Sequence, residues 1–147
     1  MEITILFLPL IASIISGFFG KYIGDRNSEI LTSAFVCISA ILSIFVLYQV
    51  IVNQYEENIV IATWINSGSL NVNWSMLIDP LSAVMLVVVT SVSSLVHIYS
   101  IGYMSHDAHK PRFMAYLSLF TFAMLMLVTS DNFMQLFFGW ELSLIHI

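Results

Sequence analysis

Long runs of apolar residues, separated by short clusters of charge, dominate the pattern of this 147-residue chain. Four runs cover residues 3–19, 30–52, 80–101 and 113–130, and a fifth begins at Phe133. A helix needs about 20 apolar residues, at a rise of about 1.5 Å each, to cross the hydrocarbon core of a bilayer. The pattern therefore predicts an all-α polytopic membrane protein with about five transmembrane helices, the fifth incomplete because only 15 residues remain from Phe133.

Between the second and third runs the pattern changes to the period of a strand. Residues 70–76 alternate apolar and polar side chains, and the β-branched run "IVIATWI" at 59–65 comes before them. Alternation of this kind is typical of a half-buried strand. The sequence "NSGS" at 66–69 favours a turn. We therefore expect a small β-hairpin on the outer face between helices two and three, with an amphipathic loop on the lipid headgroups as the alternative.

Composition supports a membrane location and excludes several classes of function. Hydrophobic residues make up 59% of the chain and charged residues 9%, against about 25% charged residues in an average soluble domain. The lipid bilayer is therefore an expected partner. Four basic residues form no patch for nucleic acid, so no nucleic-acid partner is expected. Cys37 is the only cysteine, and His106 and His109 lack a third firm ligand, so we expect no disulfide framework and no metal site.

The signs of the charges predict the orientation in the membrane. All the basic residues lie in the segments after the first and third runs: Lys21, Arg26, Lys110 and Arg112. The segments after the second and fourth runs hold only acidic charge: Glu56, Glu57, Asp79 and Asp131. Because positive charge gathers on the cytoplasmic side of membrane proteins, this alternation places the N-terminus outside and the basic segments inside.

Two ionisable residues lie near the ends of the predicted third helix. Asp79 comes directly before Pro80, where a carboxylate caps free amide groups and proline suits the first turn, so we interpret Asp79 as a helix cap. The alternative is a role in an outer proton exit path or in a subunit contact. His97 lies about one turn from the inner end of the helix, where we expect it to rest at the membrane interface, with a proton relay as the alternative.

Glu141 is the candidate with the strongest physical argument. It stands about 13 Å into the fifth predicted helix, near the middle of a hydrocarbon core about 30 Å thick. An ionised carboxylate is costly there, but burial favours its neutral form and a nearby lysine its charged form, so it can load and release a proton. We predict a proton carrier. The alternatives are a neutral glutamate that joins two helices by a hydrogen bond, and a fifth helix that does not span the membrane.

The chain resembles subunit L of bacterial respiratory NADH:quinone oxidoreductase, complex I, in three stretches. They are "DPLSAVMLVVVTSVSSLVHIYS" at 79–100, "HIYSIGYMSHD" at 97–107 and "RFMAYLSLFTFAMLMLVTSDNFMQLFFGWE" at 112–141. The resemblance implies an antiporter-like membrane subunit that translocates protons while quinone is reduced elsewhere in the complex. It also implies that Glu141 is a proton-channel residue, whose working partner is a lysine in a broken helix further along.

The resemblance carries expectations about chemistry and location. The sequence contains no phosphate loop, dinucleotide glycine pattern or iron–sulfur cysteine set, so the chain is expected to hold no cofactor itself. NADH, flavin, iron–sulfur clusters and quinone would belong to other parts of the complex. As a subunit of a translocase the chain would be part of an enzyme, with the other membrane subunits of complex I as partners. The expected location is the bacterial inner membrane.

Members of that family are several times longer, so the resemblance implies an N-terminal fragment. Residues 1–147 would form a single membrane domain, with three leading helices and the hairpin in 1–111 and the start of the first inverted repeat in 112–147. Such a fragment is predicted to be inactive alone, because inverted-repeat transporters need both halves of the site. "LSLIHI" at 142–147 departs from the glycine-containing continuation of the family, and we hypothesise that it is not native.

Two other functions stay open at this point. One is the large subunit of a multi-subunit sodium/proton antiporter, which has a similar helix and a similar "WE" motif. The other is a structural or assembly membrane protein without transport. Replacing Glu141 by glutamine separates transport from structure, because only a transport role predicts lost pumping with assembly intact.

Overall fold

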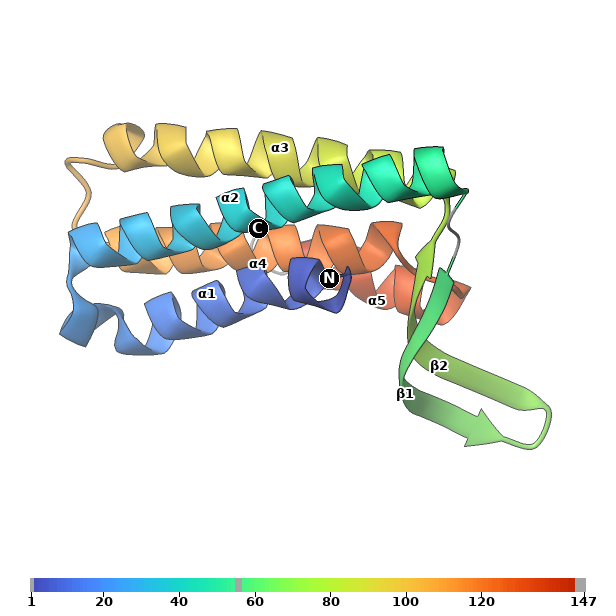
Figure 1. Cartoon of the computed structure of the whole chain (residues 1–147). Coiled ribbons are helices and arrows are strands. Elements are labelled where there is room, and N and C mark those ends of the chain that lie inside the picture. The colour runs from blue at the N-terminus through green and yellow to red at the C-terminus, as the bar shows by residue number, and fades with distance from the viewer. Residues whose placement is uncertain (1, 55–56, 145–147) are drawn as a thin grey trace.

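The structure is a computed structural model that describes residues 2–54 and 57–144. The elements in these residues, in chain order, are α1 (Glu2–Ile23), α2 (Asp25–Asn53), β1 (Glu57–Ser67), β2 (Leu70–Ile78), α3 (Pro80–Tyr103), α4 (Lys110–Val128) and α5 (Phe133–Leu144). The long helices α1 to α4 run side by side and alternate in direction, and the hairpin projects from one end of the bundle (Figure 1). The predicted helical membrane fold with a small hairpin between the second and third helices is confirmed.

Four helices are long and apolar enough to cross a bilayer, namely α1 from Ile3, α2, α3 and α4. They are the four complete spans that the apolar runs predict. The described part of α5 has 12 residues, fewer than the about 20 that a span needs, in agreement with the predicted incomplete fifth span. Residues 142–144 continue α5, whereas residues 145–147 lie outside the described part of the chain. The hypothesis about 142–147 therefore stays a prediction.

The connection between α1 and α2 differs from the predicted loop. Only Gly24 separates the two helices, and Lys21 and Arg26 stand inside helices. Gly24 has a φ of 94°, a left-handed conformation that glycine adopts without penalty because it has no Cβ. The predicted start of the second helix was wrong because an apolar run marks only the part of a helix that can lie in the hydrocarbon core. The backbone hydrogen bonds of α2 begin several residues earlier, in its polar first turn.

The hairpin forms where the alternating pattern predicts it. Strands β1 and β2 pair antiparallel, with Ser67 opposite Leu70 next to the turn. Gly68, with a φ of 59°, supplies the left-handed turn residue. Val72 and Met76 are buried as the alternation predicts, whereas Leu70 near the tip is exposed. The alternation of apolar and polar residues thus predicts which side chains are buried only where β2 lies against the helices.

The hairpin is joined to the helices through β2. The backbone N–H of Leu77 donates to the carbonyl of Thr129 at 2.8 Å, just after α4 ends. Gln135, in the first turn of α5, donates from Nε2 to the Ser75 carbonyl at 2.8 Å and accepts the Ser75 N–H through Oε1 at 3.0 Å. The Trp74 ring lies 4.8 Å from that of Phe138 on α5. These contacts fix the start of α5 and hence its course along the bundle.

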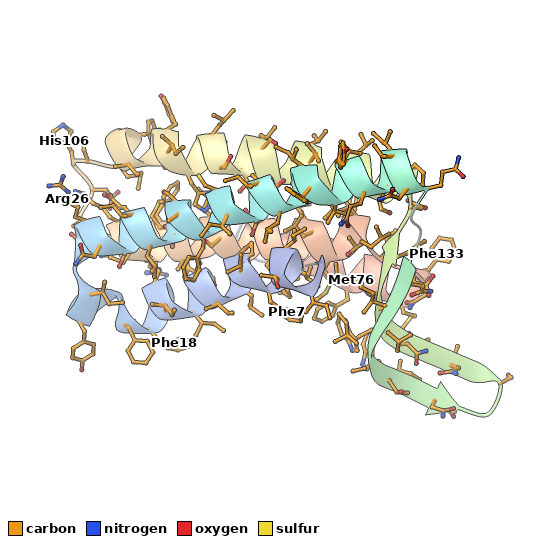
Figure 2. All side chains as sticks on the ribbon, in the orientation of Figure 1. Phe7, Phe18, Arg26, Met76, His106 and Phe133 are labelled. Carbon is orange, nitrogen blue, oxygen red and sulfur yellow. The ribbon has the colours of Figure 1, made fainter. Side chains whose placement is uncertain are left out.

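The basic residues gather at one end of the bundle. Arg26 and His106 lie at one end, whereas Met76 and Phe133 lie at the other (Figure 2). The first end, where α1 meets α2 and α3 meets α4, holds all the basic residues and is called the basic end: Lys21, Arg26, Lys110 and Arg112. The hairpin end holds Asp79 and Asp131. This separation is the one that the charge pattern predicts; Glu56 lies outside the described residues, and the membrane sidedness stays a prediction.

The interior of the bundle differs between these ends. Near the hairpin the buried residues form an apolar core: Ile5, Leu6, Val46, Val50, Met76, Ile78, Ala83, Leu86, Phe122, Leu125 and Met126. Towards the basic end α2, α3 and α4 bury a group of side chains called here the polar interior: Ser28, Glu29, Thr32, Ser33, Ser39, Ser43, Thr90, His97, Ser100, Ser118 and Thr121. A change from apolar to polar burial along the same helices marks the second region as a place to look for function.

Candidate functional site

His97 lies inside the bundle. Its side chain is 0% exposed, so it faces neighbouring helices and not the outer surface of the bundle, whereas its depth in the membrane, and with it the expected position at the membrane interface, stays a prediction. The side chain faces inward because of helical periodicity. Leu86, Thr90, His97 and Ser100 recur at intervals that keep one face of α3 turned inward, and all four are buried.

Both ring nitrogens of His97 have hydrogen-bond partners. Nδ1 lies 2.7 Å from the carbonyl oxygen of Ser93, one turn earlier on α3. Nε2 lies 3.1 Å from the hydroxyl of Ser118 on α4. The Ser93 hydroxyl lies 3.3 Å from Nδ1 and 2.5 Å from the hydroxyl of Thr121 on α4. These four residues, Ser93, His97, Ser118 and Thr121, form the His97 network, which joins α3 to α4.

This geometry favours one neutral tautomer and leaves a route to the charged one. An Nδ1–H that donates to the Ser93 carbonyl leaves Nε2 to accept the Ser118 hydroxyl. If His97 takes up a proton at Nε2, the Ser118 hydroxyl can turn and accept instead, because a hydroxyl is both donor and acceptor. The network therefore contains one titratable group between two hydroxyls, inside membrane-spanning helices.

The rest of the polar interior extends this pattern. The hydroxyls of Ser43 on α2 and Thr90 on α3 lie 2.7 Å apart, and Thr90 also donates to the Leu86 carbonyl at 2.6 Å. Nearer the basic end, the buried hydroxyls of Ser28 and Ser33 have no hydrogen-bond partner among the described residues. Buried hydroxyls in proteins are rarely left unpaired, and ordered water is their usual partner when protein groups are absent.

Glu141 lies on a different helix and in different surroundings. Gly139 sits directly on α4, where an added Cβ would come within 3.1 Å of the Ala123 carbonyl oxygen and of Leu127. Glu141, two residues on, is exposed on another face of α5. Within residues 2–54 and 57–144 its carboxylate forms no hydrogen bond or ion pair, so nothing there links it to His97 or Asp79. The structure confirms that Glu141 is on a helix and leaves its role as proton carrier untested.

Asp79 acts as the helix cap that the sequence predicts. Its Oδ1 accepts the backbone N–H of Ser82 at 2.7 Å, and Pro80 occupies the first turn of α3. It stands at the hairpin end, about 27 Å along α3 from His97 at about 1.5 Å per residue. The structure therefore does not bring Asp79 and His97 together, and the proposed roles of Asp79 in an exit path or a subunit contact remain untested.

Comparisons with known proteins identify the family of the chain. A family model described as the N-terminus of chain 5 of NADH-ubiquinone oxidoreductase (complex I) matches residues 64–114, a range that contains both Asp79 and His97. NADH-ubiquinone oxidoreductase chain 5 of Phytophthora infestans is 54% identical over 139 residues, which is 95% of this chain and 21% of the relative. The Arabidopsis thaliana protein of the same name is 53% identical over 141 residues, 96% of this chain and 21% of the relative. The chain belongs to the complex I chain 5 family.

The family confirms the complex I resemblance that the sequence motifs indicate. The chain spans about a fifth of the length of the family members that it matches. Those members come from eukaryotes, so the bacterial source implied by the resemblance is not confirmed. The four apolar helices agree with a multi-pass membrane protein.

Sequence reasoning missed most of the groups that surround His97. The apolar pattern places Ser93, Ser118 and Thr121 only within helices, although small polar residues recur near His97 at helical spacing. Gln135, which is 1% exposed and binds the hairpin, was missed as well. Its signal was the polar side chain in an otherwise apolar first turn. In both cases the partner lies on another element, which a single-helix pattern cannot identify.

Proposed function

We propose that this chain is the N-terminal part of a proton-translocating membrane subunit of NADH:quinone oxidoreductase. The observation that carries the proposal is the His97 network, a buried titratable ring with hydroxyl partners on two spanning helices. Ionisable groups inside membrane helices are costly, and those that persist commonly mark ion or proton pathways. The names of the relatives indicate the enzyme to which the subunit would belong. The His97 network contains the groups that would transfer the proton.

The proposed transfer uses the two nitrogens of His97 in turn. A proton arriving through the Ser118 hydroxyl binds Nε2 and converts the ring to imidazolium. The proton on Nδ1 then leaves through the Ser93 hydroxyl towards Thr121, which leaves the ring neutral with its remaining proton on Nε2. One proton enters and one leaves, so the charge of the ring is unchanged, and the ring must return to the Nδ1–H tautomer before the next transfer.

Glu141 is the second carrier in this proposal. Its carboxyl would exchange a proton near the middle of the membrane and would need a cationic partner to favour its charged form. The family resemblance assigns that part to a lysine in a later helix. Asp79 would contribute on the outer side, beyond its structural role as a cap.

The wider setting of the proposal follows from the family. The electron transfer, with NADH, flavin, iron–sulfur clusters and quinone, would lie in other parts of the complex, and the other membrane subunits would be the partners. The membrane is the one that carries complex I, with the N-terminus of this chain outside. The bacterial inner membrane remains a prediction, because the relatives reported above are eukaryotic.

The test compares two histidines in intact complex I that carries full-length chain 5. His97→Gln keeps a polar side chain of similar length but cannot carry a proton, whereas His106→Gln changes an exposed loop histidine. Proton uptake is measured per NADH oxidised in proteoliposomes, after assembly has been checked. We expect His97→Gln to lower this ratio several-fold and His106→Gln to leave it unchanged. Glu141→Gln is measured in parallel.

Two results would contradict the proposal. A wild-type ratio with His97→Gln would show that the network only holds α3 to α4. A sodium-dependent ratio in the unmodified complex would favour the antiporter alternative.

A further inference from the structure

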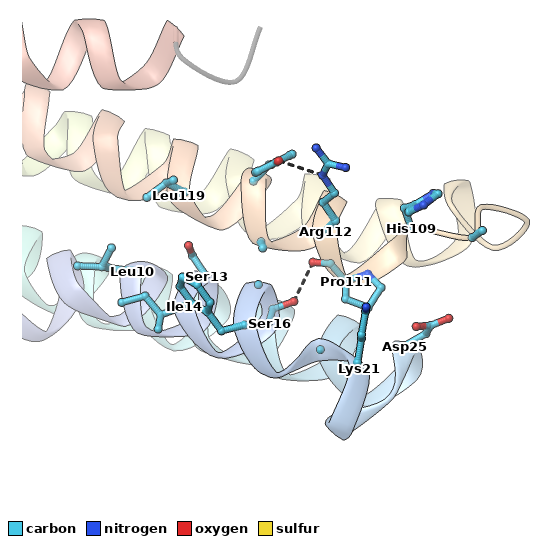
Figure 3. A pocket seen from close by; sticks show the side chains of 16 residues that line it. Leu10, Ser13, Ile14, Ser16, Lys21, Asp25, His109, Pro111, Arg112 and Leu119 are labelled. Carbon is cyan, nitrogen blue, oxygen red and sulfur yellow. Dashed lines mark hydrogen bonds between the residues drawn. The ribbon is translucent and has the colours of Figure 1, made fainter.

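A groove of about 800 Å³ runs between α1 and α4 at the basic end. Its floor is the line of contact between the two helices, where Gly17 faces Ala115. A Cβ added at Gly17 would lie 3.6 Å from the Cβ of Ala115. Its walls include Leu10, Ile14 and Leu119 (Figure 3). Small residues along this line of contact thus leave an elongated apolar slot on the side of the bundle.

Charged residues lie at the basic end of this slot. Lys21 comes from α1, Arg112 from α4 and Asp25 from the start of α2 (Figure 3). With these formal charges, the rim carries one net positive charge. Arg112 is oriented by Tyr116, because its Nε donates to the Tyr116 hydroxyl at 2.9 Å and its guanidinium carbon lies 5.4 Å from the ring centre.

The dimensions of the slot match one leaflet of a bilayer. From Leu10 to Lys21 the helix advances about 16 Å at about 1.5 Å per residue. Half of a hydrocarbon core about 30 Å thick is nearly the same length. The charged rim therefore lies at headgroup level when the slot lies along the acyl region of the same leaflet.

We infer that this groove binds one phospholipid with an anionic headgroup. One acyl chain lies in the slot above Gly17 and Ala115, and the phosphodiester lies between Lys21 and Arg112. Its single negative charge matches the net charge of the rim, and basic pockets between transmembrane helices are a recurring form of lipid recognition. A zwitterionic lipid would bring an additional ammonium group towards Lys21 and Arg112 and is disfavoured. This inference does not rest on proton translocation.

The experiment uses intact complex I with full-length chain 5, reconstituted in phosphatidylcholine vesicles. The vesicles contain a minor fraction of phosphatidylglycerol with a photoactivatable acyl chain. Cross-linked peptides are mapped by mass spectrometry. We expect labelling of α1 and α4 at residues that line the slot, and several-fold less of it in the Lys21→Gln and Arg112→Gln double variant. Arg26→Gln is the matched control, because Arg26 lies at the same end but not among the residues that line the groove.

Each other outcome overturns the inference. Equal labelling by a phosphatidylcholine probe would show an apolar slot without headgroup selection. An unlabelled slot would show that another segment of the protein or another subunit covers it. An equal loss in Arg26→Gln would reduce the effect to the general charge of the basic end. Lys21→Gln alone keeps the Arg112–Tyr116 contact, so a loss with that variant cannot be ascribed to a disturbed α4.

Discussion

The apolar core and the polar interior are built from the same helices, yet their burial differs in kind. Near the hairpin, Leu86 and Leu125 are fully buried and pack with Met76 of β2. Nearer the basic end, Thr90 and His97 on the same α3 are equally buried but bind through hydrogen bonds. Lipid is as apolar as leucine, so neither burial follows from hydrophobicity alone. The difference indicates that close packing holds the hairpin end together, whereas the buried polar side chains nearer the basic end serve a purpose other than stability.

The strongest way to break the comparison is a cavity in the apolar core. Leu86→Ala removes a side chain that is 0% exposed. We expect it to lower the free energy of unfolding by about 3 kcal/mol, mainly through the cavity. Leu95→Ala on the same helix is the control, since Leu95 is 67% exposed and its change leaves no cavity. The measurement is unfolding of the full-length protein in mixed micelles, and equal effects of the two changes would refute the assignment of the core.

A smaller effect is expected where the hairpin joins α5. Gln135→Ala leaves the N–H and carbonyl of Ser75 without their side-chain partner, which costs about 2 kcal/mol for buried groups. The hairpin should then become sensitive to limited proteolysis while the helices stay protected. Gln49→Ala on α2 is the control, because Gln49 forms no side-chain hydrogen bond within the described residues. Unchanged proteolysis would show that the aromatic contacts of the hairpin suffice.

The smallest effect is expected in the polar interior, and it sharpens the comparison most. The pair Ser43→Ala and Thr90→Val removes both hydroxyls of one hydrogen bond and keeps the shape of the side chains. Because both partners become apolar, the free energy of unfolding should change by less than about 0.5 kcal/mol. Unfolding in the same micelles measures it. A loss above about 2 kcal/mol would mean that hydrogen bonds between helices hold this region together, and the polar interior would then contribute to stability as the apolar core does.

The sequence by itself determined the features that depend on near neighbours in the chain. Apolar length predicted the spans, alternation and "NSGS" predicted the hairpin, and Asp79-Pro80 predicted the start of α3. Motifs in residues 79–141 led to complex I, and the family comparison confirmed it. Each of these signals lies within one element or one turn, where spacing and conformation are directly related.

Only the tertiary structure decided which faces of the elements meet. It buried His97 against Ser118, joined Gln135 to Ser75, placed Gly139 and not Glu141 against α4, and brought Lys21 beside the same groove as Arg112. The physical reason is that nearly every face of these helices is apolar, so the pattern along one helix does not show which face turns inward. That choice depends on the shapes of small and large side chains on several helices at once, and it sets the surroundings of each candidate residue.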